Sequence, residues 1–456
     1  MLTSNELAER LARLAEKFTV TGASAALWHD GTLVRAETGT VNVDTGAPVL
    51  PGTLFAAGSV TKTLTASLAM TLVDEGRLDL DAPVTAYLPG FTTADPDRSA
   101  AITVRMLLTH SSGLPGNYLP DLPPGDDVLE RLMDELATLN VTGEPGRRFS
   151  YSNMGMSTLG RLVEVITGER FDVALRSRIL QPLGMTAPAD AEEMLLHSTA
   201  VGHVVDGTVR RVPRLRVWPE YGPAGSRLWL DVEALIRFGR MHLDGHPLLS
   251  AAAVEQMRTP QYDDFWGCLP GCANFGLGWG IFREGDDPVL THSGANLGMH
   301  STLYVVPGQK VVLAVLTNSS TGGMLHSTLC TELLDEFFDV QGPAPIAPPE
   351  SPFEVDGARF AGRYRASDGQ VAVEVHDGQL HARLLPDAGL TEWDRLMGSR
   401  TGGGQAVPIT CVDGERSRFV LDTGSPGSHV AVQFFEPDPD GRFTLVRLGT
   451  LYERTP

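Results

Sequence analysis

Short apolar runs occur in pairs at two places in the chain, with a turn signal between the two runs of each pair. Apolar runs within 25–34 flank Asp30-Gly31, a dipeptide typical of a tight hairpin turn. Apolar runs within 303–316 flank Pro307-Gly308 in the same way, and a long helix is expected from about Cys330. The pattern therefore predicts one hairpin near the start of the chain and another near residue 310.

Between these hairpins the apolar positions follow the helical period instead. Residues 62–75 and 154–167 are expected as helices that end at Gly76 and Gly168. The N-terminus predicts a further amphipathic helix, with Ser4 or Asn5 as its N-cap. Strands at both ends with helices between them favour an α+β fold, in which one antiparallel sheet carries an inserted helical region.

The chain divides at a proline-rich stretch. Residues 341–352 contain five prolines and are expected to form a stiff linker after a first domain at 1–340. The second domain, 353–456, has short alternating runs such as 371–375 and 430–435, which predict a small all-β barrel or sandwich.

Composition narrows the function classes. A net charge of −20 argues against nucleic acid or an anionic membrane as a partner. No stretch approaches a transmembrane span, and the N-terminus has no pattern of a signal peptide, so a cytoplasmic location is expected. The four cysteines have no histidine or acidic residue at a spacing that would complete the ligand set of a zinc site. They are expected as reduced thiols, with a disulfide in the Cys268–Cys272 loop as the alternative. No metal and no cofactor are expected.

Lysine is scarce in this chain, and one lysine follows a serine by three residues. Only Lys17, Lys62 and Lys310 are lysines among 36 basic residues. Unlike arginine, lysine can lose its proton when it is buried. Ser59 and Lys62 lie on one face of a helix, so the amine can activate the hydroxyl as a nucleophile. A chance Ser-x-x-Lys is expected in roughly one such chain in five, so this motif needs partners.

Two further motifs supply those partners in order. They are Tyr151-Ser152-Asn153, before a helix, and His292-Ser293-Gly294, at the entrance to the closing sheet. With these three motifs the chain resembles the serine β-lactamases and penicillin-binding proteins. It is most similar to the class C β-lactamase branch, which includes esterases, D-peptidases and acyltransferases. The segments 104–114, 179–185 and 276–280 extend the resemblance over most of the first domain.

The resemblance implies a role for each motif residue. Ser59 is the nucleophile that becomes acylated, and Lys62 and Tyr151 share the transfer of protons, which requires shifted pKa values. Asn153 is expected to hydrogen-bond Lys62 and the substrate amide. The backbone N–H groups of Ser59 and Ala295 are expected to form the oxyanion hole.

The third motif departs from the pattern of members that bind β-lactams well. Those members usually have lysine where this chain has His292. A histidine there can hold the Tyr151 hydroxyl but is a less constant positive charge, which favours the esterase, peptidase or acyltransferase members. Gly294 is expected where substrate approaches the strand backbone closely.

Other residues near the motifs have a packing and a functional interpretation. Trp218, Tyr221 and Trp229 more often pack in a core, but they fall where the family has a loop lining the acyl pocket and are candidates for substrate contact. His110 is interpreted as structural. Gly402-Gly403-Gly404 lacks the residues of a phosphate loop and is interpreted as a flexible turn.

The sequence thus predicts a serine acyl-enzyme catalyst that takes an acyl group from an ester, amide or thioester and passes it to water or an amine. One alternative is a penicillin-binding-protein-type thioesterase that macrocyclises nonribosomal peptides, a group that the chain also resembles in a lipocalin-like second domain. Another is a D-amino-acid peptidase or carboxylesterase. A non-catalytic binding protein with a degenerate site is the rival from a different class. The expected partner is a small-molecule or peptidyl acyl substrate, including a carrier-bound thioester.

Overall fold

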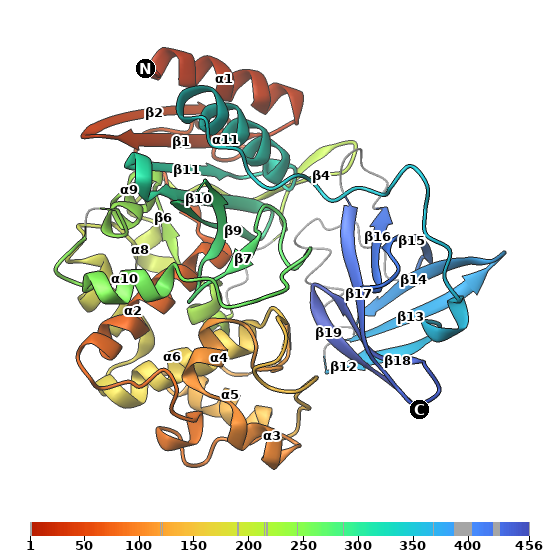
Figure 1. The fold of residues 1–456 in the computed structure, drawn as a ribbon. Coiled ribbons are helices and arrows are strands. Elements are labelled where there is room, and N and C mark those ends of the chain that lie inside the picture. Colours follow the sequence, from red (N-terminus) through yellow and green to blue (C-terminus); the bar gives the residue numbers. More distant parts are fainter. Residues whose placement is uncertain are drawn as a thin grey trace.

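The computed structural model contains a helix-and-sheet part followed by a closed barrel (Figure 1). The two parts are joined by residues 341–352, all described, which form neither helix nor strand. The described residues are 2–118, 120, 122–188, 191–213, 215, 218–243, 245–285, 287–367, 369–386, 404–422 and 429–455.

Seven strands of the first part form one antiparallel sheet in the order β2-β1-β11-β10-β9-β8-β7. Both predicted hairpins are present, and they lie side by side because β1 pairs with β11. Asp30 and Gly31 have φ angles of 43° and 89°, which suits a tight two-residue turn. The strands are β1 (Gly22–His29), β2 (Thr32–Gly39), β7 (Asn274–Phe275), β8 (Gly280–Glu284), β9 (Asp287–Asn296), β10 (Met299–Val306) and β11 (Val311–Thr317).

Helices cover both faces of this sheet, so both faces are apolar. On β1, Ala25 and Leu27 face the layer of α1 (Ser4–Lys17) and α11 (Gly322–Phe338), whereas Ala26 and Trp28 face the larger helical core. Figure 1 shows α1 and α11 together on one side of the sheet and the inserted helices on the other. This arrangement confirms the predicted fold class, although α11 begins at Gly322 and not near Cys330.

The inserted region is mostly helical and includes the two predicted helices. Its helices are α2 (Thr61–Asp74), α3 (Pro96–Ala101), α4 (Val104–Leu108), α5 (Val128–Leu136), α6 (Asn153–Thr167), α7 (Phe171–Leu175), α8 (Ala191–Met194), α9 (Val232–Met241) and α10 (Ala251–Met257). Two-stranded sheets pair β3 (Phe55–Ala56) with β6 (Trp229–Leu230) and β4 (His203–Val205) with β5 (Val209–Arg211). None of the helices in the described ranges is long and apolar enough to cross a membrane.

The second part is a closed eight-strand barrel, as the resemblance to a lipocalin-like domain implied. Its strands are β12 (Gly362–Ala366), β13 (Gly369–His376), β14 (Gln379–Pro386), β15 (Val407–Asp413), β16 (Arg418–Asp422), β17 (His429–Pro437), β18 (Phe443–Leu448) and β19 (Thr450–Arg454). A buried aromatic cluster that includes Phe360, Tyr364 and Phe434 fills its interior. Of the predicted glycine turn, Gly402 and Gly403 lie outside the described residues.

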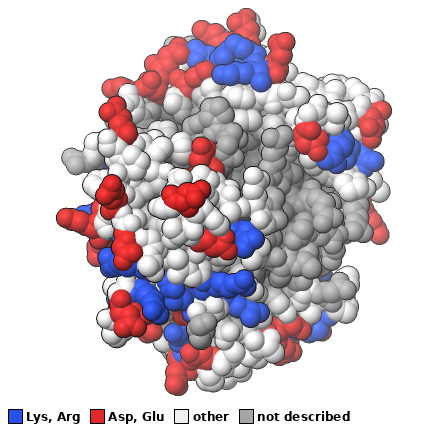
Figure 2. All heavy atoms as spheres, turned by 90° about the vertical axis from the view of Figure 1, so that its right-hand side faces the viewer, with Lys and Arg blue, Asp and Glu red and all other residues white. Residues whose placement is uncertain are grey.

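Polar contacts dock the barrel onto the first part. The carboxylate of Glu453 accepts hydrogen bonds from Arg98 and from the Gly143 N–H, both at 3.0 Å. The Leu451 N–H donates to Ser150 Oγ at 3.1 Å, directly before Tyr151 in the chain. Through these contacts the barrel supports the segment that carries Tyr151. Acidic and basic side chains are interspersed on this side of the molecule (Figure 2).

Replacing Glu453 with alanine should weaken this docking. The change removes one of the acceptors of Arg98, which keeps the Val141 carbonyl at 2.9 Å, and it removes the carboxylate that accepts from the Gly143 N–H. The free energy of unfolding should therefore fall by about 1 kcal/mol. Urea titration measures the loss, with the exposed Glu415→Ala variant on the same barrel as the control. Equal stability of the two variants would contradict the docking role.

Candidate active site

A short 3-10 turn, η1 (Gly58–Val60), places Ser59 directly before helix α2. Gly58 makes this placement possible because its φ is +52° and a Cβ there would lie 2.7 Å from the Ala295 nitrogen. The turn therefore packs against the backbone of β9, the strand that carries the third motif. Lys62 follows on α2 and is completely buried.

Lys62 meets the requirements of a general base. Its Nζ lies 2.9 Å from Ser59 Oγ and donates to the Ala224 carbonyl at 2.6 Å. Burial lowers its pKa well below the ordinary value, and no carboxylate among the described residues forms an ion pair with it. Burial therefore favours the neutral amine over the ammonium. When the Lys62 amine donates one hydrogen to the Ala224 carbonyl, the lone pair of its nitrogen can accept the Ser59 proton.

This burial predicts how pH affects stability. The pKa of Lys62 is lowered in the folded chain and returns to its ordinary value of 10.5 in the unfolded chain. Between the two values the unfolded chain binds one more proton, so the free energy of unfolding should rise with pH. Lys62→Met should lack this contribution. Between about pH 7 and about pH 9, the free energy of unfolding of the wild type should rise relative to that of Lys62→Met by at most about 1.4 kcal/mol per pH unit. Urea titrations at both pH values test this; identical pH dependence would contradict it.

Tyr151 lies beside the same two residues. Its side chain hydrogen-bonds Ser59, and Lys62 Nζ lies 5.0 Å from the centre of its ring. Burial raises the pKa of Tyr151, and the hydrogen bond with Ser59 only partly opposes this shift. The hydroxyl is therefore protonated and is suited to donate a proton rather than to take the first one.

His292 lies on β9 and is neutral. Burial first, and then the nearby Lys62, lower its pKa to about 3. Its Nδ1 lies 2.7 Å from the Ser293 carbonyl, which makes Nδ1 the protonated nitrogen. Its buried Nε2 has no hydrogen-bond partner among the described residues, so the expected bond to the Tyr151 hydroxyl is not formed. The ring is 6.4 Å from Phe275.

Asn153 does not form the hydrogen bond to Lys62 that the resemblance implied. It is the first residue of α6, where Ser152 caps the helix, and its Nδ2 donates to Asn117 Oδ1 at 2.5 Å. Lys62 instead donates to Ser59 and Ala224. Because Asn117 and Asn153 both line the pocket at Ser59, the amide of Asn153 still faces the site.

The pocket at Ser59 is small, about 40 Å³. It brings together the two backbone positions expected for the oxyanion hole, Ser59 and Ala295. Of the three aromatic candidates, Tyr221 lines this pocket, whereas Trp218 and Trp229 are buried in the core and do not. The full lining is Gly58, Ser59, Asn117, Asn153, Tyr221, Ala224, Gly225, Ser226, Ala295 and Asn296.

His110 is closer to the site than the sequence suggested. Its ring lies 4.5 Å from the Tyr151 ring, and its Nδ1 accepts the Ser152 N–H at 3.2 Å. It is held in the left-handed region, with φ of 57°, by the turn after α4. Its position between the Ser111-Ser112-Gly113 turn and Tyr151 supports one side of the site, and no local sequence pattern could have paired it with residue 151.

Gly294 has a packing reason besides substrate approach. A Cβ at 294 would lie 2.4 Å from the Ala57 oxygen and 2.7 Å from the Ser59 nitrogen. Gly294→Ala should therefore push β9 away from Ser59, lower the free energy of unfolding by about 1–3 kcal/mol and slow acylation. Thermal melts and acylation rates measure both effects. Gly90→Ala, which adds its methyl in open space, is the control, and equal behaviour of the two variants would contradict the close contact.

The described part of the chain has no cluster of three or more His, Cys, Asp or Glu side chains that could hold a metal ion. The four cysteines are free thiols, so the loop disulfide is not formed. The site consists of a hydroxyl, an amine, a phenol and backbone N–H groups, which can transfer an acyl group through a covalent ester.

A family model described as Beta-lactamase matches residues 7–329, so the chain belongs to the beta-lactamase family. Among its relatives, it is 37% identical to penicillin-binding protein 4 of Amycolatopsis lactamdurans over 377 residues, which is 79% of this chain and 97% of that protein. The crystal structure of SurE superposes with a TM-score of 0.82 at 28% identity and covers 99% of both chains. The D-amino acid amidase of Ochrobactrum anthropi SV3 gives a TM-score of 0.57 at 25% identity, covering 69% of this chain and 91% of the amidase.

Proposed function

We propose that this protein is a serine acyl-enzyme catalyst that accepts an acyl group on Ser59 and passes it to water or an amine. The observation that carries this proposal is the contact of 2.9 Å between Ser59 Oγ and the buried Lys62 amine. A neutral amine in contact with a serine hydroxyl has little use in a packing role, because burying it costs stability. It is what an activated nucleophile requires.

In the proposed acylation, each proton that leaves one of the groups Ser59, Lys62 and Tyr151 has a stated acceptor. Ser59 Oγ attacks the donor carbonyl while its proton moves to Lys62, and the backbone N–H groups of Ser59 and Ala295 stabilise the negative oxygen. The bond to the leaving group breaks as Tyr151 donates its proton to that group. Lys62 then returns its proton to Tyr151, so both groups are restored. Water or an amine releases the acyl group by the reverse sequence.

A second, narrower candidate is a thioesterase of the penicillin-binding-protein type that joins a peptidyl carbonyl to an amine and so macrocyclises a nonribosomal peptide. It is favoured by the closed barrel, because a lipocalin-like second domain is what the resemblance to this group implied. SurE is similar over 99% of both chains, and its structure with D-Leu superposes with a TM-score of 0.79. A D-amino acid amidase and the esterase EstB of Burkholderia gladioli are also similar proteins. Donors with a D-residue at the reacting carbonyl are therefore the first to test.

The test is the intact mass of the protein after mixing with four donors: a p-nitrophenyl ester, a penicillin, a D-amino-acid amide and a peptidyl thioester mimic. A mass gain that is lost in Ser59→Ala but retained in Ser67→Ala, a buried serine on the same helix, supports the proposal. The donor that reacts identifies the substrate class. Product analysis with and without an added amine then separates hydrolysis from aminolysis. No adduct with any donor would favour a non-catalytic binding protein.

A further inference from the structure

A second cavity, which we call the α5–α7 cavity, lies in the helical region apart from the catalytic pocket. Its volume is about 470 Å³, against about 40 Å³ at Ser59, and no residue lines both. That volume is within the range of small-molecule sites. Much of its wall is apolar, with Val128, Leu129, Phe171, Leu175, Leu180 and Leu228.

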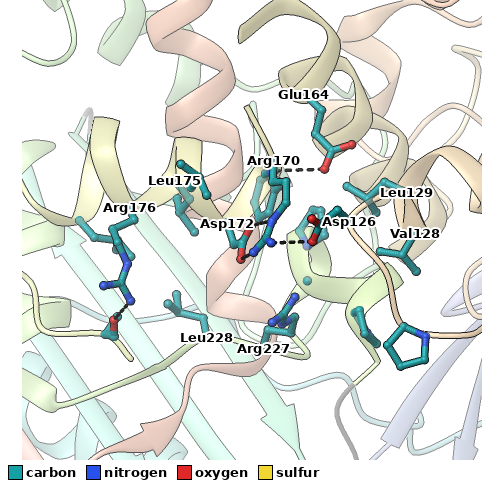
Figure 3. Close-up of a pocket in the computed structure, with 18 of the residues that line it drawn as sticks. Asp126, Val128, Leu129, Glu164, Arg170, Asp172, Leu175, Arg176, Arg227 and Leu228 are labelled. Carbon is teal, nitrogen blue, oxygen red and sulfur yellow. Dashed lines mark hydrogen bonds and ion pairs between the residues drawn. The ribbon is translucent and has the colours of Figure 1, made fainter. Parts of the chain in front are cut away.

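Most of the charged groups in this cavity already satisfy one another. Arg170 donates to both oxygens of Asp172 at 3.1 and 2.6 Å and to Asp126 at 2.6 Å (Figure 3). Arg176 is paired with Glu193 at 3.1 Å. The Asp126 side chain is 82% exposed, so solvent screens its charge. The acidic oxygens in the cavity therefore have little capacity left for a cationic ligand.

Arg227 differs from these groups. It is half-buried, and no described residue accepts a hydrogen bond from its guanidinium, which interacts with Asp172 through charge alone. Figure 3 shows its guanidinium below the Asp126–Arg170–Asp172 group. A guanidinium offers five N–H donors in a plane, which match the two oxygens of a carboxylate.

We propose that the α5–α7 cavity binds an amphipathic monocarboxylate, with its apolar tail against Leu129, Phe171 and Leu228 and its carboxylate on Arg227. The apolar wall favours a ligand with a hydrophobic portion, and the guanidinium of Arg227, which donates to no described residue, favours an anionic acceptor. The neighbouring Asp172 disfavours an anion with more than one charge, such as a phosphate. This site is independent of the proposed acyl transfer.

The same chain segment separates this cavity from the catalytic pocket. Gly222 and Pro223 of η4 (Pro219–Ala224) face the α5–α7 cavity, and Ala224 lines the Ser59 pocket. On the catalytic side, the Pro223 carbonyl accepts from Thr65 at 2.8 Å and the Ala224 carbonyl accepts from Lys62 at 2.6 Å. A ligand in the α5–α7 cavity would therefore lie beside the segment whose carbonyls accept from Thr65 and Lys62, without entering the Ser59 pocket.

Calorimetric titration of the full chain with decanoate tests the proposal. We expect one site per chain and a loss of affinity of about tenfold or more in Arg227→Met. The neutral analogue decanol should bind more weakly than decanoate to wild type and equally well to wild type and Arg227→Met. The Arg416→Met variant, in the barrel, controls for the loss of one positive charge. Equal decanoate affinity in wild type and Arg227→Met, or no binding at all, would overturn the proposal.

Two further measurements locate the ligand. Val173 lines the cavity and is 44% exposed, so Val173→Trp should fill the space without disturbing the core and should remove binding of both decanoate and decanol. Decanoate should still bind Ser59→Ala and protein acylated at Ser59. Loss of binding on acylation, with the acyl group confined to the Ser59 pocket, would place the ligand at the catalytic site and overturn the proposal. Thermal melts establish that each variant is folded.

Discussion

Replacing Lys62 with methionine should slow acylation of Ser59 on the order of 10⁴-fold. Methionine fills much of the same buried space but offers no lone pair for the Ser59 proton. The neighbouring groups cannot take over this function, because Tyr151 is protonated with a raised pKa and His292 makes no hydrogen bond to Ser59 among the described contacts. The measurement is the rate of mass gain with whichever donor acylates the wild-type protein.

Two variants separate the loss of the base from the loss of charge. Lys62→Arg keeps a cationic side chain that does not release its proton, so it should be as inactive as Lys62→Met. Lys310→Met, in the turn between β10 and β11, removes a lysine far from the site and should leave acylation unchanged. Acylation of Lys62→Met within about tenfold of wild type would show that another group takes the proton.

The parts of the fold that the sequence predicted are those specified locally. The turn at Asp30-Gly31 and the helix stop at Gly168 depend on backbone conformations that these residues favour, and both are present. The start of α11 was predicted too late because Gly322 and Gly323 are poor helix formers. Burial of Leu325 and Leu329 against the sheet outweighs that preference, and such a tertiary contact cannot be read from local propensity.

In the candidate site, too, local contacts were predictable and contacts with distant segments were not. Ser59 and Lys62 lie three positions apart across the junction of η1 and α2, so spacing alone predicted their contact. The second acceptor of Lys62 is the Ala224 carbonyl, 162 positions along the chain, and backbone carbonyls have no sequence signature. The pairing of Asn153 with Asn117 was missed because the loop before α5 brings Asn117 to the site. Side-chain chemistry was therefore predictable, whereas partners contributed by distant loops were not.

Replacing Tyr151 with phenylalanine should slow acylation on the order of 10³-fold with an amide donor. The variant keeps the ring that packs on His110 and loses only the hydroxyl that contacts Ser59. Because the raised pKa makes this hydroxyl a proton donor, its main contribution is expected at the leaving group. An amine must be protonated to leave, whereas p-nitrophenolate leaves without a proton.

The loss in Tyr151→Phe should therefore be much smaller with a p-nitrophenyl ester than with an amide, and the comparison needs only the two acylation rates. Tyr262→Phe is the matched control, because Tyr262 is also largely buried but donates to the Thr109 carbonyl and not to Ser59. Equal losses with both donors would instead assign Tyr151 to the attack of Ser59, the step common to both. In that case the proton of the leaving group would have to come directly from Lys62, which lies within 5.0 Å of the Tyr151 ring centre.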